Sequence, residues 1–413
     1  MRHEEVVWET KLVTHCRICK SDKLTTYLDL GELPLANGLL TSKEQSYPRY
    51  PLEVMLCEVC HLSQLSLVVN PKILYSNYPY RSSTSRTFQR HCYDMGASLN
   101  RLYHANKLVD FDTAQPTFID IGANDGCLIR QFKRHGFKPI LAVEPDEKMW
   151  DYIDKDVPKL NHFWCEKNTH LLNMKANFVI AQNVFAHVDD IRDFLRGANN
   201  VMYDWSILVI EIPSARSMVH HHEFDTIYHE HLSYFLLSSL IPLFASEGLD
   251  IFKVERFKIH GGTIRIYASR EKYPHDGSVE LEVETDKHCG MYELATYLAF
   301  AKKVVDTKDD LVGLLDRLKG SRILGFGASA KGSTLLNYCG ITLPYIIDDT
   351  PSKQGKVMPG VMIEIHPYNF ADIQTTDYIL LLAWNFRDEI ITNINASGYK
   401  GKWIVPIPEV EVV

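Results

Sequence analysis

Four adjacent residues of the chain combine side chains that could move a proton: Tyr228, His229, Glu230 and His231, within the stretch DTIYHEHLSYF. A histidine titrates near neutral pH. With a carboxylate to orient it and a phenol to share developing charge, it can remove a proton from a carbon beside a carbonyl group. The pattern therefore suggests carbanion chemistry. Alternate residues of an extended segment share a face, so the two histidines would face one way and the other two residues the opposite way. If the stretch instead begins a helix, all four could line one concave rim.

Four cysteines form two C-x-x-C pairs, Cys16 with Cys19 and Cys57 with Cys60. Each pair turns two thiolates to one side, and two pairs supply the four soft ligands of a closed tetrahedral zinc site. Because every position is then filled, the predicted zinc is structural and contributes folding energy. A nucleic-acid-binding ribbon is the alternative, but the basic residues lie beside the first pair alone.

A cofactor site is predicted where the apolar strand TFIDI runs into the turn GANDG and then into a helical pattern. Asp120 ends this strand, and Glu144 of LAVEPD ends the next one. A carboxylate at that second position can accept both hydroxyls of a ribose. The G-x-G-x-x-G pattern that cradles a pyrophosphate is missing, which favours an adenosine cofactor without a pyrophosphate.

This segment resembles the class I S-adenosylmethionine methyltransferases, through DIGANDG, VEPD and FVIAQNVFAHV in that order. The resemblance implies S-adenosylmethionine as the cofactor. The residues expected to bind it are Asp120, Gly122, Asn124, Asp125, Gly126, Glu144, Pro145 and Asn183. For Asn124 and Asp125 the alternative is a capped turn that opens a helix.

A second strand, glycine turn and helix follow in RILGFGASAKGSTLLNYCG. The turn lacks the third glycine of a dinucleotide site, and Ser333 stands where a P-loop needs lysine. Its backbone N–H groups, with Ser329 and Lys331, could still meet a diphosphate. In HGGTIRIYAS, Arg265 could face a phosphate or solvent.

Taken together, the cysteine pairs, YPYRSSTS, DIGANDG, NVFAHV, YHEH and HGGTIRIYAS resemble the nucleotide-sugar C-methyltransferases of deoxysugar biosynthesis over essentially the whole chain. The resemblance implies that His231 removes the C3 proton of a 4-keto sugar linked to dTDP or GDP. Tyr228 and Glu230 would position this base and stabilise the enolate, and His187 would make a second polar contact. C3 would then take the methyl group. The plainer alternative for His231 and His187 is a hydrogen-bonded interior histidine.

The same resemblance places a second set of residues around the sugar. Those expected to bind the substrate are Asn37, Tyr78, Tyr80, Arg81, Ser83, Arg265 and Lys331. The tyrosines could equally be packing residues.

The elements that position these groups predict an α/β protein. A class I methyltransferase core with a Rossmann-like sheet (76–275) would lie between a small zinc-binding domain (1–75) and a carboxyl-terminal Rossmann-like domain (276–413). With 413 residues and 46% hydrophobic content, the chain can bury two or three cores.

Composition narrows the partners and the location. A net charge of −8 weighs against nucleic acid. The sequence shows no apolar run long enough to span a bilayer, and its start is too polar for a signal peptide, so a cytoplasmic protein is expected, and the family suggests a monomer.

Two other functions were considered. An NAD-dependent sugar oxidoreductase or dehydratase is disfavoured by the missing G-x-G-x-x-G. An inactive zinc-ribbon interaction protein is disfavoured because Asp120, Glu144 and the candidate base are all present.

Overall fold

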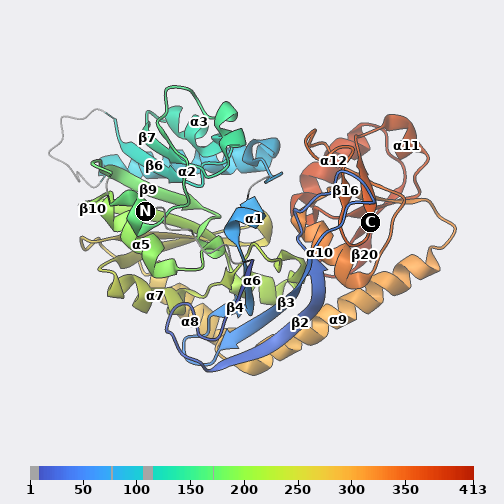
Figure 1. Cartoon of the computed structure of the whole chain (residues 1–413), viewed down its shortest axis with the longest axis horizontal. Helices are drawn as coiled ribbons and strands as arrows, with labels where there is room; N and C mark the ends of the chain where they lie inside the picture. The colour runs from blue at the N-terminus through green and yellow to red at the C-terminus, as the bar shows by residue number, and fades with distance from the viewer. Residues whose placement is uncertain (1–8, 76–77, 106–114, 171) are drawn as a thin grey trace, which may run out of the picture.

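The computed structural model describes residues 9–75, 78–105, 115–170 and 172–413 (Figure 1). Residue 76, the predicted start of the second domain, lies outside these ranges, and the predicted domain boundaries stay predictions. The described strands form three larger sheets and one two-stranded sheet. Among the described residues, no helix is both long and apolar enough to cross a membrane.

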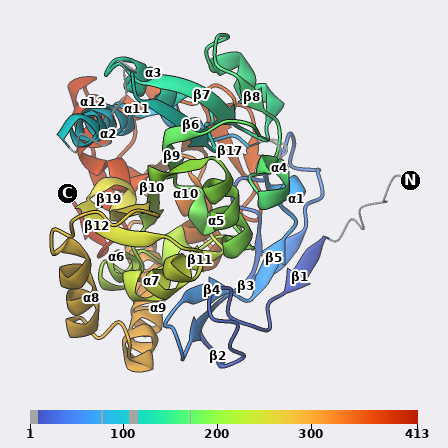
Figure 2. The ribbon, with the colours of Figure 1, turned by 90° about the vertical axis from the view of Figure 1, so that its left-hand side faces the viewer.

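An antiparallel sheet in the order β11, β4, β3, β2 carries the second cysteine pair at its β3–β4 turn. Its strands are β2 (Leu24–Pro34), β3 (Arg49–Cys57), β4 (Ser63–Leu65) and β11 (Ser233–Tyr234). Since β11 follows residues 228–231 almost directly, its pairing with β4 fixes that stretch against the cysteine-bearing sheet. A separate pair, β1 (Thr10–Leu12) and β5 (Leu67–Val69), lies beside this sheet (Figure 2).

The central seven-stranded sheet has the order β12, β13, β10, β9, β6, β7, β8. Its strands are β6 (Thr117–Ile121), β7 (Lys138–Val143), β8 (Lys159–Leu160), β9 (Ala176–Gln182), β10 (Met202–Pro213), β12 (Asp250–Phe257) and β13 (Thr263–Ser269). The strands from β8 to β10 are parallel, and β13 is antiparallel to both of its neighbours. The parallel part has the doubly wound order 3-2-1-4-5, so the predicted Rossmann-like core is confirmed.

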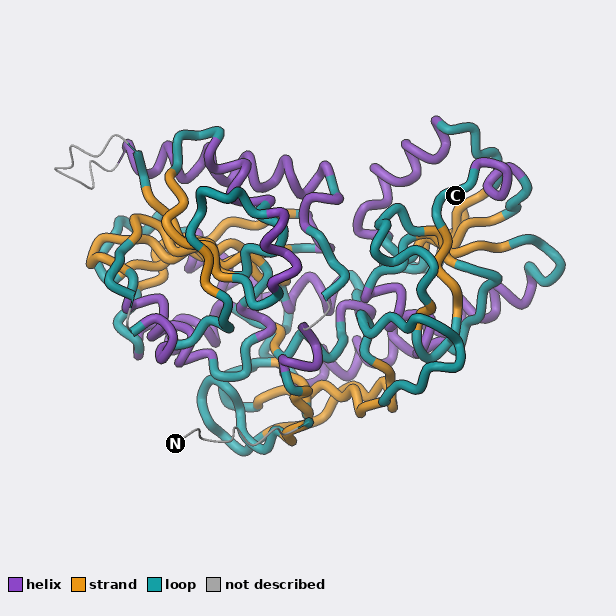
Figure 3. Tube along the Cα trace, turned by 45° about the horizontal axis from the view of Figure 1, so that its top comes forward, coloured by secondary structure: helices purple, strands orange, loops and turns teal. Residues whose placement is uncertain are grey.

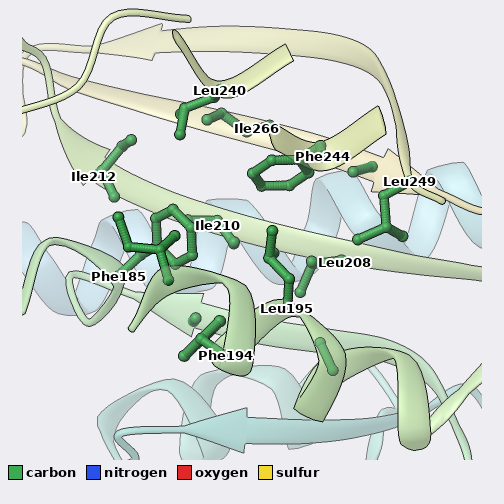
Figure 4. Packing of buried hydrophobic residues seen from close by; sticks show 14 of the residues in the cluster. Phe185, Phe194, Leu195, Leu208, Ile210, Ile212, Leu240, Phe244, Leu249 and Ile266 are labelled. Atoms are coloured by element: carbon green, nitrogen blue, oxygen red, sulfur yellow. The ribbon is translucent and has the colours of Figure 1, made fainter. Parts of the chain in front are cut away.

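Helices cover both faces of the central sheet, which explains why β6 and β9 read as continuous apolar runs. The side chains of Phe118 and Phe178 pack with α2 (Arg86–Ala105) and α3 (Cys127–Lys133) on one face. Those of Ile119 and Val179 belong to the opposite core, with α5 (Ile191–Asn200) and α7 (Leu237–Ser246). Figure 4 shows this second core, where the aromatic and leucine side chains of α5 and α7 pack over β10.

The third sheet has the order β16, β17, β15, β14, β18, β19, β20 and is parallel from β17 to β19. Its strands are β14 (Ile323–Phe326), β15 (Ile346–Ile347), β16 (Val357–Met358), β17 (Ile363–His366), β18 (Tyr378–Leu381), β19 (Lys402–Val405) and β20 (Glu411–Val412). Helices flank it (Figure 3), namely α10 (Ala330–Cys339), α11 (Phe370–Gln374) and α12 (Arg387–Ala396).

Two helices connect the central and third sheets. They are α8 (Ser278–His288) and the long α9 (Leu294–Arg317), which runs beneath β2 in Figure 1. Shorter elements carry many of the candidate site residues or lie next to them: α1 (Pro71–Tyr75), η1 (Ser82–Thr84), η2 (Glu147–Tyr152), α4 (Glu166–Thr169), η3 (Phe185–His187), α6 (Ala215–His220), η4 (Phe224–Thr226), η5 (Ile259–Gly261) and η6 (Trp384–Phe386).

Candidate active site

The two cysteine pairs meet, as their spacing predicts. The four Sγ atoms all lie within 4.8 Å of one another, and the Cys16–Cys60 and Cys19–Cys57 Sγ distances are both 3.5 Å. Tetrahedral zinc with Zn–S bonds of about 2.3 Å needs sulfur atoms roughly 3.8 Å apart, so these residues fit the metal. The ring of His61 stacks on Tyr292 instead, with centroids 4.8 Å apart. The four-cysteine zinc site is thereby confirmed.

A cavity of about 580 Å³ lies where the central sheet, the cysteine-bearing unit and the third sheet meet. It brings together most of the residues predicted from the sequence. Those that line it are Asn37, Tyr78, Tyr80, Arg81, Gly122, Asn124, Glu144, Pro145, Asn183, His187, Tyr228, His231 and Lys331. Among the described residues that were also predicted, Ser83, Asp120, Asp125, Gly126, Glu230 and Arg265 do not line it.

The turn between β6 and α3, which the sequence predicts to bind the cofactor, lines one end of the cavity. Gly122 has φ +71° and an N–H group that donates to the Val143 carbonyl at 2.8 Å. The carboxylate of Glu144, at the end of β7, accepts from the Asn124 N–H at 2.8 Å and lines the cavity. Met149 and Trp164 add an apolar wall at the same end. A carboxylate for ribose hydroxyls beside a slot for a flat base fits an adenosine cofactor.

Asn124 and Asp125, the two polar residues of the same turn, bind the loop that contains Ser82 and Ser83, a role beyond the helix cap considered as the alternative. Asn124 accepts from the Ser82 N–H at 3.0 Å, and Asp125 accepts from the Ser83 N–H at 3.0 Å and from the Ser83 hydroxyl. Arg81 of this loop stacks on Tyr152, 3.8 Å from the ring centroid. The loop predicted to contact substrate is therefore anchored on the cofactor turn.

Asp120 lies at the end of β6 and is only 3% exposed. Burial raises the pKa of its carboxyl group well above the usual value, and Glu144 adds to the effect. Its Oδ2 atom has no hydrogen-bond partner among the described residues.

Residues 228–231 form a turn, so neither alternative holds as stated: the stretch is not extended, and only Tyr228 and His231 of the four line the cavity. The His231 N–H donates to the Tyr228 carbonyl at 2.9 Å. This turn brings the side chains of Tyr228 and His231 next to each other. The Tyr228 hydroxyl lies 2.8 Å from His231 Nε2. His229 points the other way, with Nε2 3.2 Å from the Tyr50 carbonyl oxygen.

The tautomer of His231 follows from its partners. Nδ1 lies 2.8 Å from the Thr226 carbonyl oxygen, and a carbonyl can only accept, so Nδ1 carries the proton. Nε2 then keeps its lone pair and accepts from the Tyr228 hydroxyl. Burial lowers the pKa of His231 well below its usual value, and nearby His187 lowers it further. The imidazole is therefore neutral at physiological pH and able to accept a proton.

His187 lies beside His231 on the cavity wall and packs edge-to-face against it, with ring centroids 5.0 Å apart. Its Nδ1 lies 2.6 Å from the hydroxyl of Tyr75, and burial lowers its pKa to about 4. Tyr75 also packs against Tyr78, with centroids 5.5 Å apart. Tyr75 lines the cavity but was missed from the sequence, although the repeated tyrosines of YSNYPY were a signal for it.

Glu230 does not line this cavity, and its carboxylate pairs with Asn37. Its two carboxylate oxygens accept from Asn37 Nδ2 at 2.9 and 2.8 Å, and the pair lines a separate cavity of about 220 Å³. Burial raises the pKa of Glu230 to about 7, although hydrogen bonds from Asn37 and Tyr78 oppose the shift.

This pKa predicts a pH dependence of stability. Because the folded-state pKa lies above the ordinary value of 4.5, the folded protein holds this proton more tightly than the unfolded chain does. The stability that this bound proton gives the folded protein is fully present below pH 4.5. It is lost as pH rises through 7, and the loss in the free energy of unfolding is roughly 3 kcal/mol. In Glu230→Gln this loss disappears, so the free energy of unfolding should fall less between pH 5 and pH 8 than in the unaltered protein. Urea unfolding at both pH values measures it, and equal pH dependence in the two proteins would contradict it.

Arg265 requires a correction, because it faces neither a phosphate nor solvent. It lies on the interior strand β13, is 2% exposed, and its Nε lies 2.6 Å from Glu211 Oε1. The arginine and Glu211 thus neutralise each other inside the protein. Lys331 does line the cavity, with Nζ 4.3 Å from the ring centroid of Trp384 and 3.7 Å from Glu223.

The third sheet presents to the cavity a turn built like the cofactor turn. Asp348, directly after β15, accepts from the Ala328 N–H at 2.7 Å, as Glu144 accepts from Asn124. Asp348 and Lys353 line the cavity and were not singled out from the sequence. Two turns of similar construction, one from the central sheet and one from the third sheet, therefore line the same cavity.

Comparisons with known proteins agree with this geometry. Three family descriptions match successive parts of the chain: "Putative zinc binding domain" residues 16–75, "Methyltransferase domain" residues 89–254, and "C-methyltransferase C-terminal domain" residues 258–408. C-methyltransferase NovU of Streptomyces niveus is 30% identical over 421 residues, which cover 97% of each chain. The chain belongs to the C-methyltransferase family. This C-methyltransferase uses S-adenosylmethionine and has a four-cysteine zinc site.

Solved methyltransferase structures match less than half of the chain. A methyltransferase of Thermotoga maritima is 18% identical, with a TM-score of 0.32 over 45% of this chain and 98% of that one. Magnesium protoporphyrin IX methyltransferase of Synechocystis PCC 6803, solved with bound S-adenosylmethionine, is 12% identical, with a TM-score of 0.32 over 43% and 79%.

Gly122 provides a test of the cofactor end. A Cβ atom there would overlap Cγ2 of Val184, which lines the cavity, and φ is unfavourable for alanine. Since such strain costs about 1–3 kcal/mol, Gly122→Ala should weaken binding of S-adenosylhomocysteine by about tenfold or more in calorimetry. Gly136→Ala is the matched control, because Gly136 has φ +80° but open space around the Cβ position. Equal affinity in the two variants would show that the cofactor does not bind at this turn.

Proposed function

We propose that this C-methyltransferase methylates C3 of a nucleotide-linked 4-keto deoxysugar, and that His231 removes the C3 proton. The observation that carries the proposal is the position of His231, whose Nδ1 lies 2.8 Å from the Thr226 carbonyl oxygen and whose Nε2 lies 2.8 Å from the Tyr228 hydroxyl, in the cavity that Glu144 also lines. A 4-keto group acidifies the neighbouring C3–H bond by delocalising the resulting charge into an enolate, so a neutral histidine is a suitable base.

The side chains around His231 have complementary roles in this step. Nε2 takes the proton, and the Nδ1–H bond to Thr226 holds the ring and supports the positive charge that forms. The Tyr228 hydroxyl donates to Nε2 in the free protein. It has to turn to the 4-keto oxygen before Nε2 can take the proton, and from there it can donate to the enolate oxygen. His187, which packs against His231, offers a second polar contact beside it. A base contributes about 10²–10⁴-fold, so orientation and enolate stabilisation must supply the rest.

The cofactor is proposed to lie between Gly122 and Glu144, with the ribose hydroxyls on the Glu144 carboxylate. When bound there, S-adenosylmethionine supplies an electrophilic methyl group. Asn183, whose N–H donates to the Glu211 carbonyl at 2.9 Å, completes the wall of the cavity on this side.

The third sheet is proposed to hold the nucleotide of the substrate. The turn before α10 lines the cavity, Ser329 caps this helix by accepting from the Gly332 N–H, and Lys331 offers a positive charge. Backbone N–H groups at a helix start favour a diphosphate. The nucleotide is proposed to be dTDP or GDP, and the enzyme to act as a cytoplasmic monomer.

Methyl transfer tests the proposal directly. Incubation with methyl-labelled S-adenosylmethionine and a panel of dTDP- and GDP-linked 4-keto deoxysugars should give one product heavier by a single methyl group, with the label at C3. Absence of transfer to every such sugar would refute it. Tight calorimetric binding of NAD in place of S-adenosylhomocysteine would favour an oxidoreductase instead.

A further inference from the structure

Arg17 lies inside the first cysteine pair, yet its side chain points into the protein. It is 4% exposed, and its own N–H group donates to the buried Gln64 side chain at 2.9 Å. The main chain of Arg17 is thus fixed between the metal ligands Cys16 and Cys19. A guanidinium group in the interior has to be paired with acceptors, and the positions of these acceptors indicate its role.

The guanidinium group has three acceptors, and two of them belong to segments that carry the cavity histidines; the third is the Leu65 carbonyl of β4, at 3.4 Å from Nη1. Arg17 Nη1 donates to the carbonyl of Leu232 at 3.0 Å, the residue directly after His231. Arg17 Nε donates to Asp189 Oδ1 at 3.2 Å, two residues after His187. One rigid, planar side chain therefore contacts the two segments at once.

The same two segments are also joined to each other. The Leu232 N–H donates to the carbonyl of Ala186, the residue before His187, at 2.8 Å. The Leu232 carbonyl accepts additionally from the Leu65 N–H of β4, at 3.0 Å. Arg17 thus closes a small network from the cysteine pair through β4 to both histidine segments, whose rings face each other at 5.0 Å.

We propose that Arg17 is a positioning residue for His187 and His231, a role that rests on the function proposed above for these histidines. Through Arg17, the zinc-bound cysteine pair sets the placement of the two rings, in addition to stabilising its own sheet. The zinc unit is therefore part of what aligns the site, although it does not touch the substrate.

The test uses the full-length, zinc-loaded protein and two variants that break the link from opposite ends. Arg17→Lys keeps the charge, but a single ammonium group cannot reach Leu232 and Asp189 with the geometry of a guanidinium. Asp189→Asn leaves the cysteine pair untouched and removes the ion pair of Asp189 with Arg17, together with its exposed ion pair with Lys11, so Lys11→Met is made as the control for the second pair. Arg17→Lys and Asp189→Asn should each retain one zinc per chain and their affinity for S-adenosylhomocysteine, while kcat falls about 10- to 100-fold with little change in the KM for the sugar.

A second readout needs no sugar substrate. In protein labelled with ¹⁵N-histidine, His231 should give the signals of a neutral ring with Nδ1 protonated, and these signals should shift or broaden in both variants. Arg216→Lys is the matched control. Arg216 is similarly buried but pairs with Glu282 and Asp286 of α8, so it should lower Tm and leave kcat and the His231 signals unchanged.

The outcomes separate this inference from the proposed function. The role proposed for Arg17 would be overturned if Asp189→Asn and zinc-loaded Arg17→Lys both kept unchanged His231 signals and a kcat within twofold of that of the unaltered protein. If Arg17→Lys loses its zinc, the result for Asp189→Asn alone decides whether Arg17 positions the two histidines. An unaltered protein that methylates no 4-keto sugar would refute the function, while the His231 signals would still test the role of Arg17.

Discussion

In His231→Asn, kcat for methyl transfer should fall by about 10²–10⁴-fold, the contribution expected of a general base. Asparagine keeps an amide that can donate to the Thr226 carbonyl, but it has no equivalent of the unprotonated Nε2. Because the residues proposed to hold the cofactor, Gly122 and Glu144, belong to other segments of the chain than His231, binding of S-adenosylhomocysteine should be unchanged. Steady-state kinetics and calorimetry on the same preparation measure the two quantities.

His229→Asn is the control for this prediction, because it changes a histidine two residues away that is equally buried. His229 contacts the carbonyls of Tyr50 and Pro51 and does not line the cavity. Its loss should lower stability with little effect on kcat. The assignment of the base would be wrong if His229→Asn lost as much activity as His231→Asn, or if His231→Asn retained full kcat.

Cys57→Ser should remove the zinc and unfold the amino-terminal sheet. Structural zinc contributes about 10–16 kcal/mol in small zinc-binding peptides, which is as large as the whole stability of a typical domain. The sheet supplies Asn37 to the cavity wall and pairs through β4 with β11. Loss of the metal should therefore also abolish methyl transfer.

Metal analysis and thermal unfolding measure this effect. The unaltered protein should contain one zinc per chain, and Cys57→Ser should contain almost none and show a much lower Tm. Cys289→Ser is the control, since Cys289 lies at the end of α8 and far from the other cysteines in the chain. A Cys57→Ser protein with full zinc content and an unchanged Tm would contradict the structural role of the metal.

The sequence predicted the sites whose chemistry depends on local spacing. Two C-x-x-C pairs can hardly serve anything but a common metal, and DIGANDG followed by VEPD requires two parallel strands that end at the same edge of a sheet. The Rossmann-like core and the zinc site were therefore predictable. Asn37 was expected in the pocket wall, and the structure places it there.

The details that depend on tertiary contacts were not predictable. The turn that pairs Tyr228 with His231 is formed by a hydrogen bond that no local pattern announces. Arg265 reads as a half-exposed strand residue, because the sequence does not reveal that β13 lies between two other strands. The contact of Arg17 with Leu232 joins residues that are 215 positions apart.

Proton removal without methyl transfer tests the central claim most directly. In D₂O, with S-adenosylhomocysteine in place of the methyl donor, the unaltered enzyme should exchange the C3 hydrogen of the accepted 4-keto sugar for deuterium. His231→Asn should bind both ligands and exchange nothing above the background rate. Equal exchange by the two proteins, or exchange at another carbon, would show that His231 is not the base that this account requires.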